Sequence, residues 1–72
     1  MSARHVRAPA TGTVWQLAAE LDAPLAAGSV VLYVESMKME IPATMPQAGR
    51  VTAWLVRVGD AVEEGQPLAE LG

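Results

Sequence analysis

The chain has 72 residues, with eight acidic and five basic side chains, a net charge of −3 and a pI of about 4.8. A chain of this length holds one small core, so we expect a single domain over residues 1–72. The absence of cysteine excludes a disulfide framework and a thiolate metal site, and the acidic balance argues against a nucleic-acid partner. No apolar run reaches membrane-spanning length and no signal-peptide pattern begins the chain, so we expect a soluble cytoplasmic protein.

An internal repeat organises the sequence, with the second copy 37 positions after the first. Gly12 falls on Gly49, and Gly28 falls on Gly65. Each copy reads Pro-x-x-Gly-x-Val, followed by an aliphatic run, a turn and a second apolar run. Neither copy can bury its apolar face alone, so the repeat predicts one pseudo-symmetric β-sandwich.

In chain order, the pattern predicts about seven short strands and no helix. The clearest strands are expected over residues 4–8, 13–19, 30–34, 39–43, 50–58 and 67–71. Residues 15–21 also fit a helical turn or two, but their repeat partners at 52–58 are β-rich, which favours a strand. Pro42 would remove a ladder donor, which predicts a short or edge strand over 39–43. The expected structural turn positions are Gly12, Gly28, Gly49, Gly59, Asp60 and Gly65.

Residues 35–40, Glu-Ser-Met-Lys-Met-Glu, contain the only lysine of the chain, Lys38. A lysine amine can lose its proton and attack a carbonyl carbon, whereas an arginine guanidinium stays protonated. If 30–34 pairs with 39–43, Lys38 lies in the connecting turn and its amine extends into solvent. A solvated lysine amine is protonated at neutral pH, so rapid acylation needs a partner enzyme. The sequence therefore predicts a substrate for modification and not a catalyst.

Two other interpretations of this hexapeptide remain open at the level of residues. A lone lysine in a turn is usually only a solvated charge. Met37 and Met39 fit either core fillers on one strand face or a flexible recognition surface. Elsewhere, His5 has no second histidine or cysteine with which to share a metal, so no metal site is expected.

At residues 35–40 the sequence resembles the attachment motif of biotin carboxyl carrier domains, in which Met-Lys-Met follows Glu-Ala or Glu-Ser. The resemblance covers nearly the whole chain, including both Pro-x-x-Gly-x-Val elements and the run from Gly59 to Leu68. It implies an all-β, flattened barrel-sandwich of two four-stranded antiparallel sheets with pseudo-twofold symmetry. This is the hammerhead shared by biotinyl and lipoyl domains, with the modified lysine on a hairpin turn.

By the same resemblance, Lys38 carries covalent biotin, attached by a biotin protein ligase. The tethered biotin shuttles a carboxyl group between biotin carboxylase and carboxyltransferase sites of an acyl-CoA or pyruvate carboxylase. The chain is then a non-catalytic carrier and a monomer in isolation. The residues implied in recognition by the ligase and the carboxylase are Glu35, Ser36, Met37, Met39 and Glu40.

Two departures from the family pattern affect the expected structure. Asp22-Ala23 stands where the family often has Gly-Asp, which predicts a reshaped turn. The spacing from Gly12 to Asp22 leaves no room for the protruding thumb of some bacterial carriers, so the chain resembles small stand-alone biotinylated proteins or an excised domain.

Two alternatives to the biotin interpretation stay open. The first is a lipoyl carrier domain of a 2-oxo acid dehydrogenase complex, which shares the fold and the hairpin lysine. Such domains usually carry aspartate before the lysine and alanine after it, where this chain has Met37 and Met39. The second is an unmodified barrel-sandwich that acts as an interaction module.

Overall fold

The computed structural model describes residues 4–72, and these form seven strands and no helix. The strands are β1 (His5–Arg7), β2 (Gly12–Leu17), β3 (Val30–Ser36), β4 (Met39–Thr44), β5 (Val51–Trp54), β6 (Ala61–Val62) and β7 (Pro67–Leu71). Within this described part, therefore, no helix is long and apolar enough to span a membrane. The expectation of an all-β chain with about seven strands is confirmed.

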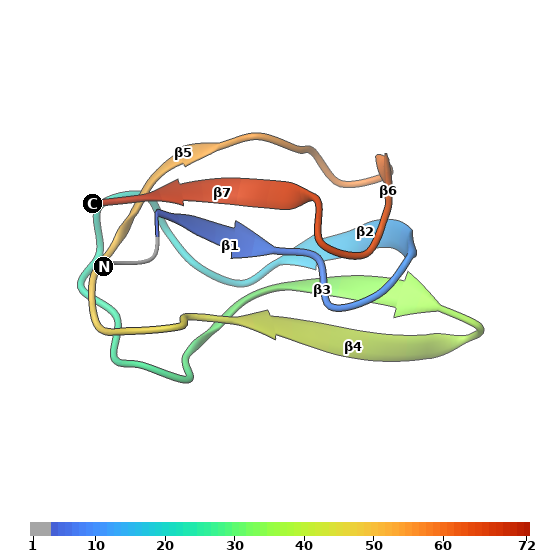
Figure 1. Ribbon diagram of the computed structural model, residues 1–72, viewed down its shortest axis with the longest axis horizontal. Helices are drawn as coiled ribbons and strands as arrows, with labels where there is room; N and C mark the ends of the chain where they lie inside the picture. The colour runs from blue at the N-terminus through green and yellow to red at the C-terminus, as the bar shows by residue number, and fades with distance from the viewer. Residues whose placement is uncertain (1–3) are drawn as a thin grey trace.

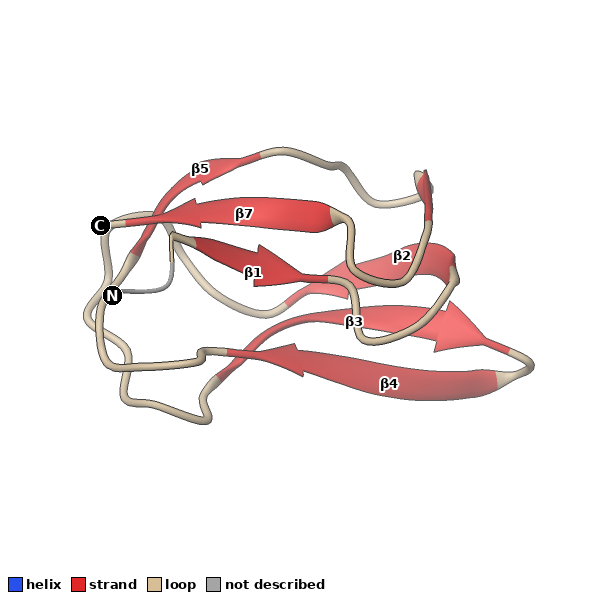
Figure 2. Ribbon diagram, viewed as in Figure 1, coloured by secondary structure: helices blue, strands red, loops and turns tan. Residues whose placement is uncertain are grey.

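The strands form two antiparallel sheets that pack face to face (Figures 1 and 2). One sheet has the order β1-β7-β5, and the other has the order β4-β3-β2-β6. As expected from Pro42, β4 is an edge strand. The β3–β4 hairpin projects at one end of the molecule, whereas the start of β1 and the end of β7 lie at the opposite end (Figure 1).

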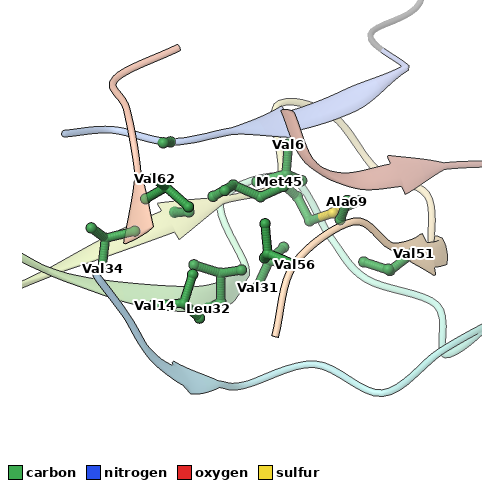
Figure 3. Close-up of a cluster of buried hydrophobic side chains, with 13 residues drawn as sticks. Val6, Val14, Val31, Leu32, Val34, Met45, Val51, Val56, Val62 and Ala69 are labelled. Atoms are coloured by element: carbon green, nitrogen blue, oxygen red, sulfur yellow. The ribbon is translucent and has the colours of Figure 1, made fainter. Parts of the chain in front are cut away.

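Aliphatic side chains from both sheets fill the core between them (Figure 3). Its largest fully buried members are Leu32 and Leu68, and valines surround them. Among residues 4–72 no polar or charged side chain is buried. Alternation along β3 explains this arrangement, since its inward positions carry Leu32 and Val34 while Tyr33 and Glu35 point outward. The core depends on close packing of short side chains, because the chain has no cysteine and no phenylalanine.

The repeat seen in the sequence recurs in the backbone hydrogen bonds. The Asp22 N–H donates to the Val51 carbonyl at 2.9 Å, and the Gly59 N–H donates to the Val14 carbonyl at 2.8 Å. The donors Asp22 and Gly59 are 37 positions apart, and so are the acceptors Val51 and Val14. In the first bond the donor is in the first copy of the repeat, and in the second bond it is in the second copy. The register of β2 on β3 is repeated by β5 on β7, including a bulge in β2 and in β5. The predicted pseudo-symmetric sandwich is therefore confirmed.

The two sheets differ in one respect from the expected pair of four-stranded sheets. Where β6 pairs with Gly12, the equivalent position of the other sheet has only an isolated bridge between Leu25 and Gly49. Its two hydrogen bonds measure 2.8 and 3.0 Å. The bond that extends the pairing of β6, from the Val14 N–H to the Asp60 carbonyl, has no counterpart between Val51 and Ala23 in the described chain. The fourth strand is thereby reduced to one bridge.

The turn at Asp22 is not reshaped, contrary to the expectation from Asp22-Ala23. Asp22 has φ 65°, in the left-handed region that Gly59 adopts with φ 97° at the equivalent position. Its N–H keeps the bond to Val51 described above. Aspartate enters this region more readily than most residues, because its short side chain can compensate by local hydrogen bonding.

The strands expected over 13–19 and 50–58 are shorter in the structure. Each pairing ends with one further bond, from the Ala18 N–H to Val31 and from the Leu55 N–H to Leu68. After Leu55 the chain turns, and the Asp60 carboxylate accepts a hydrogen bond from the Arg57 N–H at 2.8 Å. A side-chain bond of this kind closes a turn in place of a strand ladder.

Candidate functional site

The tip of the β3–β4 hairpin is a two-residue loop made by Met37 and Lys38. Ser36 pairs with Met39 across the hairpin, and both loop residues have positive φ, 51° and 65°. Positive φ at both central positions defines a type I′ turn, for which Asn-Gly is the usual sequence. In this conformation an ordinary L-residue costs roughly 1–2 kcal/mol. The loop is therefore a defined but strained turn, and such strain often marks functional positions.

Both methionines and the lysine of the tip are exposed to solvent. Met37 is 92% exposed and Met39 is 65% exposed, which excludes the interpretation that they fill the core. Lys38 is exposed, and within residues 4–72 its amine has no hydrogen bond and no carboxylate within 4.0 Å. The hairpin therefore presents a free primary amine between two accessible thioethers.

Two carboxylates lie directly opposite each other just below the tip. Glu35 of β3 pairs with Glu40 of β4, and both are exposed. Like charges at directly opposed positions of a sheet destabilise it. In the described chain no cation forms an ion pair with either of them, although Lys38 lies nearby in sequence. The tip therefore carries a local excess of negative charge.

Gly12, at the start of β2, supports the base of this hairpin. A Cβ atom at this position would collide with the backbone carbonyl of Glu35. The next residue, Thr13, pairs with Glu35. The absence of a side chain at Gly12 thus lets β2 approach the backbone of β3 just before the loop.

The predicted hexapeptide lies at one end of the molecule, and the loops on either side of β6, which hold Gly59, Asp60 and Gly65, lie at the same end (Figure 1). Gly28 and Gly65 occupy equivalent turns with φ 86° and 85°. Gly49, Gly59 and Asp60 likewise belong to turns and bridges of the sandwich. These five positions shape the fold and contribute no side chain to the hairpin tip.

Sequence reasoning missed an aromatic pair beside the site. Trp15 of β2 and Tyr33 of β3 meet edge to face, with ring centroids 6.3 Å apart and planes at 84°. Trp15 is still 44% exposed. The repeat contained a signal for this pair. The first copy has aromatic residues at these two positions, whereas the second copy has the polar residues Thr52 and Glu70.

His5 lies in β1 opposite Glu70, away from the hairpin. In residues 4–72 no group of three or more histidine, cysteine, aspartate or glutamate side chains is placed to hold a metal ion. The reactive group that the hairpin tip presents is the Lys38 amine.

Replacing Met37 with asparagine is expected to stabilise the protein by about 1 kcal/mol, because asparagine adopts positive φ at lower cost. For a chain of this size that corresponds to a rise in Tm of roughly 4–8 °C. Thermal unfolding followed by circular dichroism measures it. Met39→Asn is the matched control: Met39 is exposed but has no positive φ, so no gain is expected. Equal Tm values for Met37→Asn and the wild type would contradict a strained loop.

Comparison with known proteins agrees with this geometry. A family model described as biotin-requiring enzyme matches residues 4–71. The biotin-dependent acyl-coenzyme A carboxylase alpha3 subunit of Mycobacterium leprae is 38% identical over 66 residues, which are 92% of this chain but 11% of that protein. The biotinylated protein TB7.3 homolog of the same organism is 36% identical over 67 residues, 93% of this chain and 94% of that protein.

Among solved structures, the urea carboxylase of Kluyveromyces lactis superposes with a TM-score of 0.91 at 29% identity. The alignment covers 100% of this chain and 6% of the carboxylase. The chain thus spans nearly the full length of one small relative and only a small part of the large carboxylases that it matches.

Proposed function

This chain belongs to the biotin/lipoyl attachment family of biotin-requiring enzymes, and from that membership we propose that it is a biotin carboxyl carrier modified on Lys38. The observation that carries the proposal is the position of the only lysine. It lies at the tip of a projecting hairpin, with its amine exposed and no ion pair among the described residues. The flanking Met37 and Met39 favour biotin over lipoate.

In the proposed attachment, the deprotonated Lys38 amine attacks the acyl carbon of biotinyl-adenylate held by a biotin protein ligase. A C–N bond forms, the C–O bond to the phosphate breaks, AMP leaves, and the amine loses a proton to the ligase or to water. This chain contributes the nucleophile and a recognisable surface. Met37 and Met39 offer adaptable apolar contacts, while Glu35, Ser36 and Glu40 offer polar ones.

The attached biotin supplies a ureido ring that carries a carboxyl group between a biotin carboxylase site and a carboxyltransferase site. The role of this chain is to present that ring at the end of a flexible lysine side chain on a defined turn. Tethering keeps the cofactor close to both sites. Its effective concentration there is on the order of millimolar for a short flexible link. We propose that the partner is a carboxylase of the acyl-CoA or pyruvate type.

The test is intact-mass measurement after separate incubation with biotin protein ligase and lipoate ligase, each with ATP and its cofactor. We expect the wild type to gain one amide-linked biotin and no lipoate. A gain of lipoate, or no gain with either enzyme, would contradict the proposal.

The double variant Met37→Asp/Met39→Ala has the residues usual beside a lipoyl lysine. It is expected to lose biotinylation rate by at least about tenfold, equivalent to 1.4 kcal/mol of transition-state binding. Its circular dichroism spectrum should stay that of the wild type, because both methionines are exposed. An unchanged rate would show that the methionines do not contribute to recognition.

A further inference from the structure

The outer face of the β4-β3-β2 sheet carries an aromatic pair and a proline next to the acidic pair Glu35 and Glu40. Trp15 and Tyr33 form the edge-to-face contact, and Pro42 pairs with Tyr33 on the edge strand. Trp15 and Pro42 are exposed and Tyr33 is half-buried. Glu35 lies two positions beyond Tyr33 on β3 and therefore on the same face. We call this set, with Glu40 opposite Glu35, the Trp15 face.

The other half of the molecule serves as an internal comparison for this face. The repeat places Thr52 where Trp15 stands, Glu70 where Tyr33 stands and His5 where Pro42 stands. The strand registers at these positions coincide, because His5 pairs with Glu70 as Pro42 pairs with Tyr33. The same backbone thus forms a stable outer face from polar residues, and folding alone does not explain an aromatic one.

The acidic pair gives the Trp15 face a charge that the fold does not balance. Glu35 and Glu40 oppose each other, and no cation in residues 4–72 pairs with them. Forming an amide on Lys38 removes the positive charge nearest in sequence to both. The modified protein therefore presents two uncompensated carboxylates beside one exposed and one half-buried aromatic ring, an arrangement that complements a cationic partner.

We propose that the Trp15 face docks an arginine-bearing surface of the carboxylase partner once Lys38 has been modified, an inference that rests on the proposed function. A guanidinium group stacks on the ring of Trp15 or Tyr33 and donates two hydrogen bonds to one carboxylate. The ammonium group of a lysine does neither as well. Docking at this face would leave the adjacent hairpin, with its modified lysine, at the border of the interface.

A second copy of the chain fits this face poorly. Face-to-face pairing of two copies would bring Glu35 and Glu40 against the same carboxylates of the other copy, and like charges across an interface are unfavourable. The net charge of −3, which falls to −4 on amide formation, adds to the repulsion. The charge pattern thus selects a cationic partner.

The test is a titration of the biotinylated, ¹⁵N-labelled protein with an acetylated, amidated peptide of alternating arginine and glycine. Binding is measured from the NMR chemical shifts of the protein. We expect shifts at the Trp15 indole N–H and at the amides of Tyr33, Glu35 and Glu40. The same peptide with lysine should bind at least about threefold more weakly. Equal affinity for the two peptides, or shifts spread over both sheets, would overturn the proposal.

Variants taken from the repeat sharpen the test. Trp15→Thr installs the residue that the second copy has at the equivalent position, so the fold should tolerate it. It is expected to weaken binding of the arginine peptide by about two- to fivefold, as is Glu40→Gln. The matched control is Glu70→Gln on the other sheet, which should leave the affinity unchanged. Unchanged affinity in Trp15→Thr would overturn the proposal.

Two further readouts distinguish the carboxylase from other occupants. Trp15→Thr should retain the wild-type initial rate with biotin protein ligase within about twofold; a larger loss would assign the face to the ligase instead. Sedimentation should show a monomer, and a dimer abolished by Trp15→Thr would assign the face to a second copy. If the wild type gains no biotin in the mass measurement, the proposed function fails, whereas failed peptide binding by a biotinylated protein overturns only this inference.

Discussion

Replacing Lys38 with arginine is expected to abolish attachment of biotin, with no mass gain even after prolonged incubation with ligase. The substitution keeps the positive charge and the length of the side chain, but a guanidinium does not lose its proton near neutral pH and cannot attack the acyl carbon. The side chain is exposed and lacks partners among residues 4–72, so Tm should change by less than about 2 °C. Intact mass and an avidin blot measure the result.

The sequence itself offers a matched control for this loss. Arg50 is exposed and lies away from the hairpin, near the chain ends, where its backbone pairs with Gly72. The double variant Lys38→Arg/Arg50→Lys moves the only side-chain amine to that end of the molecule. It should also stay unmodified if, as proposed, the ligase recognises the hairpin and not merely an exposed amine. Biotin on this double variant would contradict the role of the hairpin in recognition.

The second large effect is expected from Gly12→Ala, which should destabilise the protein by about 1–3 kcal/mol. The added methyl group would collide with the backbone carbonyl of Glu35, so either β2 or the base of the hairpin must move. For a 72-residue chain the loss corresponds to a fall in Tm of roughly 4–8 °C for each kcal/mol. Thermal unfolding measures the stability, and the initial rate with ligase reports on the hairpin.

Gly49→Ala is the control, since Gly49 is the repeat equivalent of Gly12. A Cβ at Gly49 would lie 3.0 Å from the Gly72 carbonyl, a tight contact that a shift of a few tenths of an ångström relieves. Its cost should stay below about 1 kcal/mol, and it should leave the ligase rate unchanged because the contact lies away from the hairpin. Equal destabilisation by the two substitutions would show that the approach of Gly12 to Glu35 has no special importance.

Local sequence patterns predicted the features that depend on neighbouring residues. Val30 to Val34 is apolar and mostly β-branched, and it formed most of β3, with Val31, Leu32 and Val34 buried. Pro42 marked an edge strand because its missing N–H acts wherever the strand is placed. The hexapeptide of residues 35–40 was identified in the same local way, since a unique lysine is visible without any knowledge of the fold.

The features that sequence analysis missed depend on contacts between distant segments. The reduced fourth strand is one of them, because its single bridge joins Leu25 to Gly49, two residues that are far apart in the chain. The strain at Met37 was hidden, since nothing in a methionine predicts positive φ until Ser36 and Met39 pair. The contact of Trp15 with Tyr33 likewise appears only when β2 and β3 align.

The pseudo-twofold symmetry that relates the two halves of the sandwich determines how this domain can be joined to others. The repeat maps the β3–β4 hairpin onto the start of β1 and the end of β7, so these two strand ends occupy the place of a second, open hairpin. Figure 1 shows these ends opposite the tip, and the longest dimension of the molecule is 30 Å. A host protein linked beyond either strand would therefore have the folded domain between its linker and Lys38. Under the proposed function, the folded domain would act as a spacer that extends the reach of the tethered cofactor without adding flexible chain.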